Sequence, residues 1–146
     1  MTRRLVRSVA AIALAAAPTL ATACGSHATG APHGHAIHVI ECDFTIHAPR
    51  RVPAGDAVLL VSNGGPSEHE LLVVRWQAGL LPMSFGQTVV DERALRRSGA
   101  LVAAVDAVPA HGAGRIRLRL APGRYLLFCN MAGHYLSGMS AVVEVG

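Results

Sequence analysis

Three side chains that bind soft metals recur at equal steps near the C-terminus. Cys129, His134 and Met139 lie five positions apart, and a glycine, Gly133 or Gly138, stands directly before each of the last two. A β-forming run precedes this segment and another follows it, so we expect a tight loop that aims all three side chains at one point. A thiolate, an imidazole and a weak thioether are the ligand set preferred by a redox-active copper ion.

A copper site of this kind needs a second imidazole from elsewhere in the chain. The candidate is His69, which ends the polar, glycine-containing segment 63–69 just before an apolar run. Other upstream histidines fit less well, because His38 and His47 lie in or beside the first expected strand and His111 lies in a glycine-rich turn. The sequence therefore predicts a metal site at His69, Cys129, His134 and Met139.

Each of these residues has an ordinary interpretation when it is taken alone. Cys129 can be a buried structural thiol, Met139 a core side chain and His134 a surface histidine. A structural zinc site would use more Cys or His and rarely Met. The conjunction of the three in one loop after a strand, with a histidine in an upstream loop, favours copper over these alternatives.

Short β-forming runs separated by Gly and Pro turns surround these residues and predict an all-β sandwich or barrel. Aromatic residues make up only 4% of the chain, so its core must be aliphatic. The expected strands cover residues 37–46 (with a bulge near Cys42), 57–62, 71–76, 115–120, 124–129 and 140–145.

The segment 77–113 is long and poorly patterned, and it contains one helical signal. Residues 91–97 begin with acids and end with arginines, which suits a short helix and its dipole, and Gly99 should end it. We therefore expect a sandwich with a short helical insertion whose role the pattern leaves open.

The arrangement of Asn63, His69, Cys129, His134 and Met139 resembles that of the cupredoxin family, the plastocyanin- and azurin-like blue copper proteins. The resemblance covers roughly residues 37–146. It implies a Greek-key β-sandwich, one type 1 copper ion held by His69, Cys129, His134 and Met139, and one-electron transfer. The residues show no open coordination position and no acid–base pair, so we do not expect an enzyme in its own right.

The family pattern also assigns residues around the metal. Many relatives have Asn after the first histidine, where it ties the two copper loops together; here that residue is Glu70, and Asn130 can supply part of the tie. The resemblance places His134 at the surface as the electron port. The residues expected to surround it as an apolar docking patch are Met131, Ala132, Tyr135, Leu136 and Pro66.

The implied partners are redox proteins such as a cytochrome or a terminal oxidase. We expect this protein to be a monomer that binds them in short-lived contacts. A binuclear copper site would need two cysteines in this loop, and only Cys129 is present. The alternative function is an extracytoplasmic copper chaperone or store. His33, His35 and His38 lie close together and, with the extra Met residues, support it, although the preferred interpretation of these histidines is incidental residues of a solvated linker.

The N-terminus reads as an export signal. Arginines, a short uncharged apolar run and small residues fill residues 1–23, which we assign as a signal peptide. Cys24 follows, and the segment before it resembles a lipoprotein box with Ala21 in place of the usual large aliphatic residue. Acylation of Cys24 would anchor the domain to a membrane. The alternative is ordinary cleavage that leaves a plain thiol, which could then pair with Cys42; otherwise we expect Cys42 to be buried.

Residues 24–36 are small, polar and turn-rich and predict a flexible tether, with the copper domain at 37–146. The formal charge of +4 comes largely from the leader, because its removal leaves ten arginines against nine acidic residues. Nucleic acid is therefore not an expected partner. The expected location is the outer face of the cell membrane, or the periplasm or medium.

Overall fold

The computed structural model describes residues 34–84 and 86–146. The predicted leader 1–23, Cys24, His33 and the tether up to residue 33 lie outside this part of the chain. No helix in the described part has the length and apolar character needed to cross a membrane.

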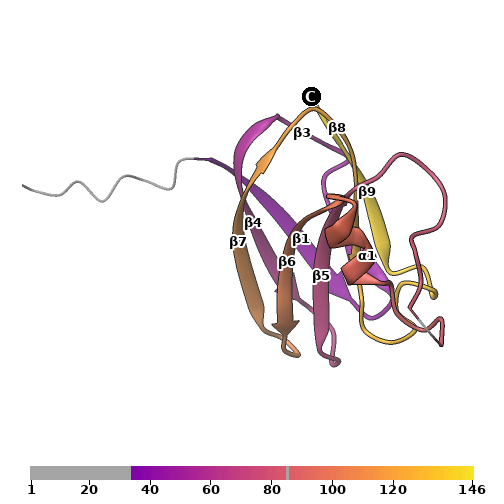
Figure 1. Ribbon diagram of the computed structural model, residues 1–146. Helices are drawn as coiled ribbons and strands as arrows, with labels where there is room; N and C mark the ends of the chain where they lie inside the picture. Colours follow the sequence, from indigo (N-terminus) through magenta and orange to yellow (C-terminus); the bar gives the residue numbers. More distant parts are fainter. Residues whose placement is uncertain (1–33, 85) are drawn as a thin grey trace, which may run out of the picture.

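The described chain forms two β-sheets packed face to face, with one short helix beside the second sheet (Figure 1). The first sheet has the strand order β2-β1-β4-β7 and the second the order β3-β9-β8-β5-β6. The elements are β1 (His35–Cys42), β2 (Thr45–His47), β3 (Arg51–Val52), β4 (Gly55–Asn63), β5 (His69–Arg75), α1 (Glu92–Arg97), β6 (Leu101–Val108), β7 (Ala113–Leu120), β8 (Gly123–Cys129) and β9 (Ser140–Val145). The predicted all-β sandwich with a short helix is confirmed.

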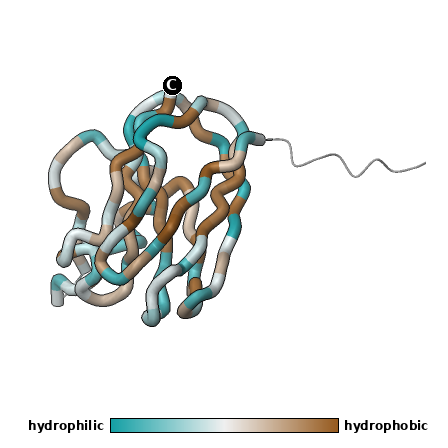
Figure 2. Tube along the Cα trace, turned by 180° about the vertical axis from the view of Figure 1, so that it is seen from behind, coloured by the Kyte–Doolittle hydropathy of each residue, from teal (hydrophilic) through white to brown (hydrophobic). Residues whose placement is uncertain are grey.

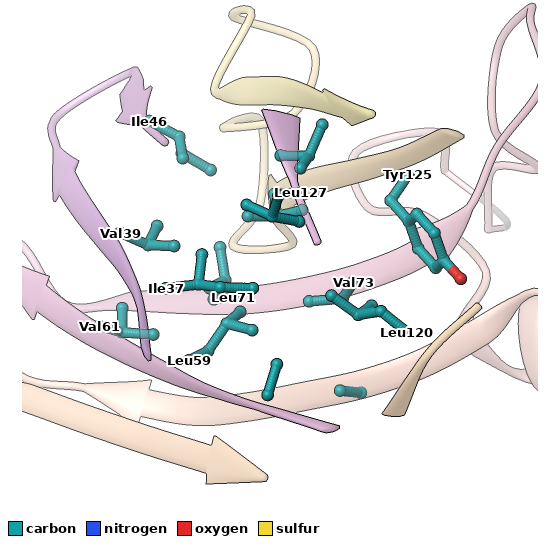
Figure 3. Packing of buried hydrophobic residues seen from close by; sticks show 14 of the residues in the cluster. Ile37, Val39, Ile46, Leu59, Val61, Leu71, Val73, Leu120, Tyr125 and Leu127 are labelled. Carbon is teal, nitrogen blue, oxygen red and sulfur yellow. The ribbon is translucent and has the colours of Figure 1, made fainter. Parts of the chain in front are cut away.

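The space between the sheets is filled by aliphatic side chains from alternate strand positions (Figure 3). Ile37 and Val39 of β1 face Leu71 and Val73 of β5 across this layer, and Tyr125 closes one end. Alternation of apolar and polar residues along a strand produces one buried and one exposed face. Figure 2 accordingly shows hydrophobic positions concentrated in the strands of the body.

A second hydrophobic cluster lies on the outer face of the second sheet, under α1 and the segment that precedes it. Its buried members are Leu72, Val74, Leu81, Val90, Leu95, Leu126 and Phe128. The helix begins after Asp91, whose side chain accepts a hydrogen bond of 3.0 Å from the amide of Ala94. The prediction for 91–97 is confirmed, and the segment 77–113 has a packing role, because it covers this face.

The single strand predicted for 37–46 is wrong. The chain forms a hairpin instead, in which β1 and β2 pair antiparallel with Cys42 opposite Thr45. The turn residue Phe44 has φ 62°, a conformation rare for a bulky side chain, so nothing in the sequence marks the turn. We expected Cys42 to be buried, but its side chain is only half-buried beside this turn.

Several strand boundaries differ from expectation by a few residues, and two strands, β3 and β6, were not expected. β1 begins at His35, so the last two residues assigned to the tether lie in a strand. β6 was not predicted, although it pairs along β5 at the edge of the second sheet. Its three alanines and Asp106 break the alternation of apolar and polar residues on which the prediction depends.

Candidate metal centre

One thiol and two imidazoles meet at one end of the sandwich. Cys129 Sγ lies 3.4 Å from His134 Nδ1 and 3.8 Å from His69 Nδ1. The donor atoms of these three residues all lie within 4.8 Å of one another. A sulfur about 2.3 Å and nitrogens about 2.0 Å from one ion would stand about 3.5–3.7 Å apart at tetrahedral to trigonal angles. The donor set therefore fits a single metal ion.

Strand pairing brings His69 to the C-terminal loop. β5 pairs antiparallel with β8, and Leu71 stands opposite Cys129. His69 is the first residue of β5 and is fully buried, so its ring reaches beside the thiol at the end of β8. The ring planes of His69 and His134 meet edge to face at 63° with 5.2 Å between centroids.

The predicted loop between β8 and β9 closes as expected from its glycines. Gly133 and Gly138 have φ 81° and 91°, which disfavour any side chain. The amide of Met139 donates to the carbonyl of His134 at 3.0 Å, and the amide of Cys129 donates to the carbonyl of Met139 at 3.2 Å. These bonds hold all three loop residues in register, and the Met139 side chain is fully buried.

Burial sets the protonation of the donors before any ion binds. It raises the pKa of the Cys129 thiol, so an arriving metal ion must displace a proton. The amide of Glu70 donates a hydrogen bond to Cys129 Sγ at 3.5 Å, which acts in the opposite direction. Burial, followed by the neighbouring His134, lowers the pKa of His69 and favours the neutral imidazole that binds metals.

Asn63 is buried and shapes the segment that leads to His69. Its side-chain amide donates to the carbonyls of Ser67 (2.7 Å), Val108 (3.1 Å) and Pro109 (3.1 Å), and its oxygen accepts from the amide of Gly65 at 2.8 Å. The segment 63–69 is therefore tied both to itself and to the turn between β6 and β7.

Replacement of Asn63 by alanine is expected to lower the free energy of unfolding by about 2–3 kcal/mol, because buried carbonyls and an amide lose their partner. Urea unfolding of the metal-free protein measures this loss. In Asn63→Asp the oxygen that accepts from Gly65 is retained and the donors are removed, so this variant separates the two contributions. Unchanged stability of Asn63→Ala would contradict the structural role.

Asn130 does not tie the two loops of the site together, contrary to expectation. Its Oδ1 accepts from the amide of Val90 at 2.7 Å, and its Nδ2 donates to Glu92 Oε1 at 3.1 Å. The amide of Gly133 also donates to the carbonyl of Thr88 at 2.8 Å. The ligand loop is thus braced by the segment before α1, which runs beside it in Figure 1.

The expected docking residues divide between the surface and the interior. Tyr135 packs edge to face on Phe128 in the second cluster, and its hydroxyl accepts from the amide of Leu81 at 3.4 Å. Met131 is half-buried against the first core. Leu136 is 58% exposed, and Phe44, which the sequence did not indicate, is 52% exposed and lies 5.3 Å from the ring of His134.

No protein-family model matches the chain, and no curated protein matches it. Several solved structures, in contrast, are similar to it. A reduced auracyanin from Roseiflexus castenholzii is 17% identical with a TM-score of 0.59, covering 77% of this chain and 98% of that one. Auracyanin A from Chloroflexus aurantiacus, described as a "blue" copper protein, is 14% identical with a TM-score of 0.54, over 76% and 98% of the two chains. Rusticyanin from Thiobacillus ferrooxidans is 16% identical with a TM-score of 0.56, over 77% and 79%. The chain therefore has the cupredoxin fold.

Proposed function

We propose that this protein is a type 1 copper protein that carries single electrons between redox partners outside the cytoplasm. The observation that carries the proposal is the convergence of Cys129 Sγ with the Nδ1 atoms of His69 and His134 at 3.4–3.8 Å. The structural likeness to a "blue" copper protein of the same fold supports it.

The four residues have distinct roles in this proposal. His69, Cys129 and His134 would supply the strong ligands of the ion, and the buried Met139 would supply the weak thioether. Cycling between Cu(I) and Cu(II) is the chemistry that the bound ion supplies. The backbone hydrogen bonds of the loop between β8 and β9 hold the donors in one arrangement, which would limit rearrangement when the charge of the ion changes.

The half-buried ring of His134 is the proposed electron port. Phe44 and Leu136 expose apolar surface near it, and exposed apolar surface suits weak, short-lived docking. A cytochrome or terminal oxidase is the proposed class of partner, and the carrier is proposed to act as a monomer. Export through residues 1–23 and a lipid anchor on Cys24 complete the proposal.

An extracytoplasmic copper chaperone or store is the second candidate, and the structure favours it less than the sequence did. His35 and His38 belong to β1, and His35 Nε2 is buried, so they do not form part of a histidine-rich tether. We do not assign an enzymatic activity, because the four donors complete the ligand set of an electron-transfer site.

Copper titration of the metal-free protein, followed by optical absorption and EPR, tests the proposal. We expect one equivalent of Cu(II) to produce an intense blue or green colour and the EPR signal of type 1 copper. A colourless copper-loaded protein would exclude the function. Fast electron exchange with a cytochrome would favour the carrier, whereas copper transfer to a metal-free acceptor without redox change would favour the chaperone.

A further inference from the structure

We propose that Asp43 is a positioning residue for the metal centre, which fixes the tautomer of His69 and lowers the reduction potential of the site by its negative charge. The sequence did not indicate Asp43 as a metal ligand. Asp43 lies in the turn between β1 and β2, far along the chain from the loop of residues 129–139 that carries three of the donors. The effect of Asp43 on the reduction potential rests on the proposed copper function. The effect of Asp43 on the tautomer of His69 does not depend on that function.

The contact between the two side chains is direct. Asp43 Oδ1 lies 3.2 Å from His69 Nε2, and the opposite ring nitrogen, Nδ1, faces Cys129 Sγ. A carboxylate can only accept a hydrogen bond, so the neutral ring must carry its proton on Nε2. The lone pair of Nδ1 is then directed at the thiol, where the metal would bind. Carboxylate–histidine pairs commonly orient metal-binding imidazoles in this manner.

The carboxylate is itself held in place on both oxygens. Ser67 Oγ donates to Asp43 Oδ2 at 3.3 Å, so the hairpin turn is joined to the segment before His69. A Cβ atom on Gly65 would lie 2.6 Å from Asp43 Oδ1, which shows that the segment passes too close for a side chain there. The Asp43 side chain is therefore confined between the β1–β2 hairpin and the segment 63–69.

The charge has a predictable consequence for the metal. His69 is fully buried, whereas the Asp43 side chain is 34% exposed, so its field reaches the site with some screening by solvent. A nearby negative charge stabilises Cu(II) relative to Cu(I), and it thereby lowers the reduction potential. A neutral acceptor in the same place would orient the ring without this electrostatic effect.

The Asp43→Asn variant separates charge from shape. Its amide oxygen can still accept from His69 Nε2, and its amide nitrogen can donate to Ser67 Oγ, so the contacts survive without the charge. We expect the ratio of Cu(II) to Cu(I) affinity to fall about tenfold, which raises the potential by about 59 mV for one electron. In Asp43→Ala both effects are lost, and we expect Cu(II) affinity to fall about 10- to 100-fold.

Asp56→Asn is the matched control, since it removes a carboxylate charge from the first sheet at the far end of β4, where Asp56 pairs with Arg119 at 3.0 Å and touches no residue of the metal centre. Its potential should equal that of the wild type. Nitrogen NMR of the metal-free protein supplies a measurement that does not depend on copper: His69 should carry its proton on Nε2 in the wild type and in Asp43→Asn, and populate both tautomers in Asp43→Ala.

Equal potentials in the wild type and Asp43→Asn, or a proton on Nδ1 of His69 in the metal-free wild type, would overturn the inference. Failure of the proposed function is distinguishable from these results, because the wild type would then lack the intense colour on copper loading. The NMR tautomer of His69 would decide the positioning role of Asp43 in that case.

Discussion

The Cys129→Ser variant is expected to fold and to lose the intense copper absorption completely. The absorption of a type 1 site arises from charge transfer between a thiolate and copper, and a serine hydroxyl cannot supply it. Cys129 is fully buried and its sulfur accepts from the amide of Glu70, so the smaller hydroxyl keeps one hydrogen-bond partner. We expect a stability loss of about 1–2 kcal/mol in the metal-free protein. Optical spectra after copper loading and urea unfolding measure the two effects.

Cys42→Ser is the control, because it removes the other thiol of the described chain, half-buried at the end of β1, and leaves the metal site untouched. This variant should keep the full absorption. Retention of the absorption in Cys129→Ser, or its loss in Cys42→Ser, would show that the copper ligand is a different thiol.

The second large effect concerns Glu41, a carboxyl group in the interior of the sandwich. It occupies the next inward position of β1 after Val39, its exposure is 0%, and neither carboxyl oxygen has a hydrogen-bond partner in the described chain. Burial, and to a lesser degree the neighbouring Glu70, raises its pKa to about 7. The folded protein therefore keeps this group protonated in a pH range where the unfolded chain releases the proton.

The raised pKa of Glu41 makes stability fall as pH rises. Below the unfolded pKa of 4.5, Glu41 is protonated in both states and the free energy of unfolding is unaffected. Between 4.5 and about 7 only the folded state holds the proton, so the free energy of unfolding falls as pH rises. Above about 7 both states are ionised and the full loss of stability remains. The shift corresponds to about 3 kcal/mol. Relative to Glu41→Gln, which cannot ionise, the wild type should lose about this amount between pH 4 and pH 8.

Unfolding in urea at a series of pH values, with both proteins metal-free, measures the difference. Glu144→Gln, a change at a half-exposed carboxylate of β9, is the control and should not reproduce a gap of this size. Parallel pH curves for the wild type and Glu41→Gln would show that Glu41 keeps an ordinary pKa in the folded protein, contrary to its burial.

Much of the fold could be predicted because local patterns match the strands that form. The perfect alternation of residues 115–120 becomes the half-exposed β7, and the acids and arginines of 91–97 become α1. The prediction failed where the local pattern was weak. β6 has small residues in place of alternation, and the turn at Phe44 adopts a backbone conformation that its side chain disfavours.

The metal site likewise has a part that local sequence predicts and a part that it does not. The spacing of Cys129, His134 and Met139 predicts one loop with three donors, because the loop is short and its glycines allow it to close. The proximity of His69 depends on the register of β5 against β8, which places Leu71 opposite Cys129. No local signal encodes that register, so the sequence offered His69 as a candidate only by elimination and by resemblance.

The sequence by itself determined the donor types, their spacing in the loop and the class of sandwich that holds them, since these depend on neighbours in the chain. Only the tertiary structure placed Asp43 on His69, directed Asn130 to Val90 and enclosed Glu41 without a hydrogen-bond partner among the described residues. These contacts join residues 26 and 40 positions apart, or depend on which face of a strand is covered. They arise from the packing of sheets, turns and insertion, and that packing is a property of the whole chain.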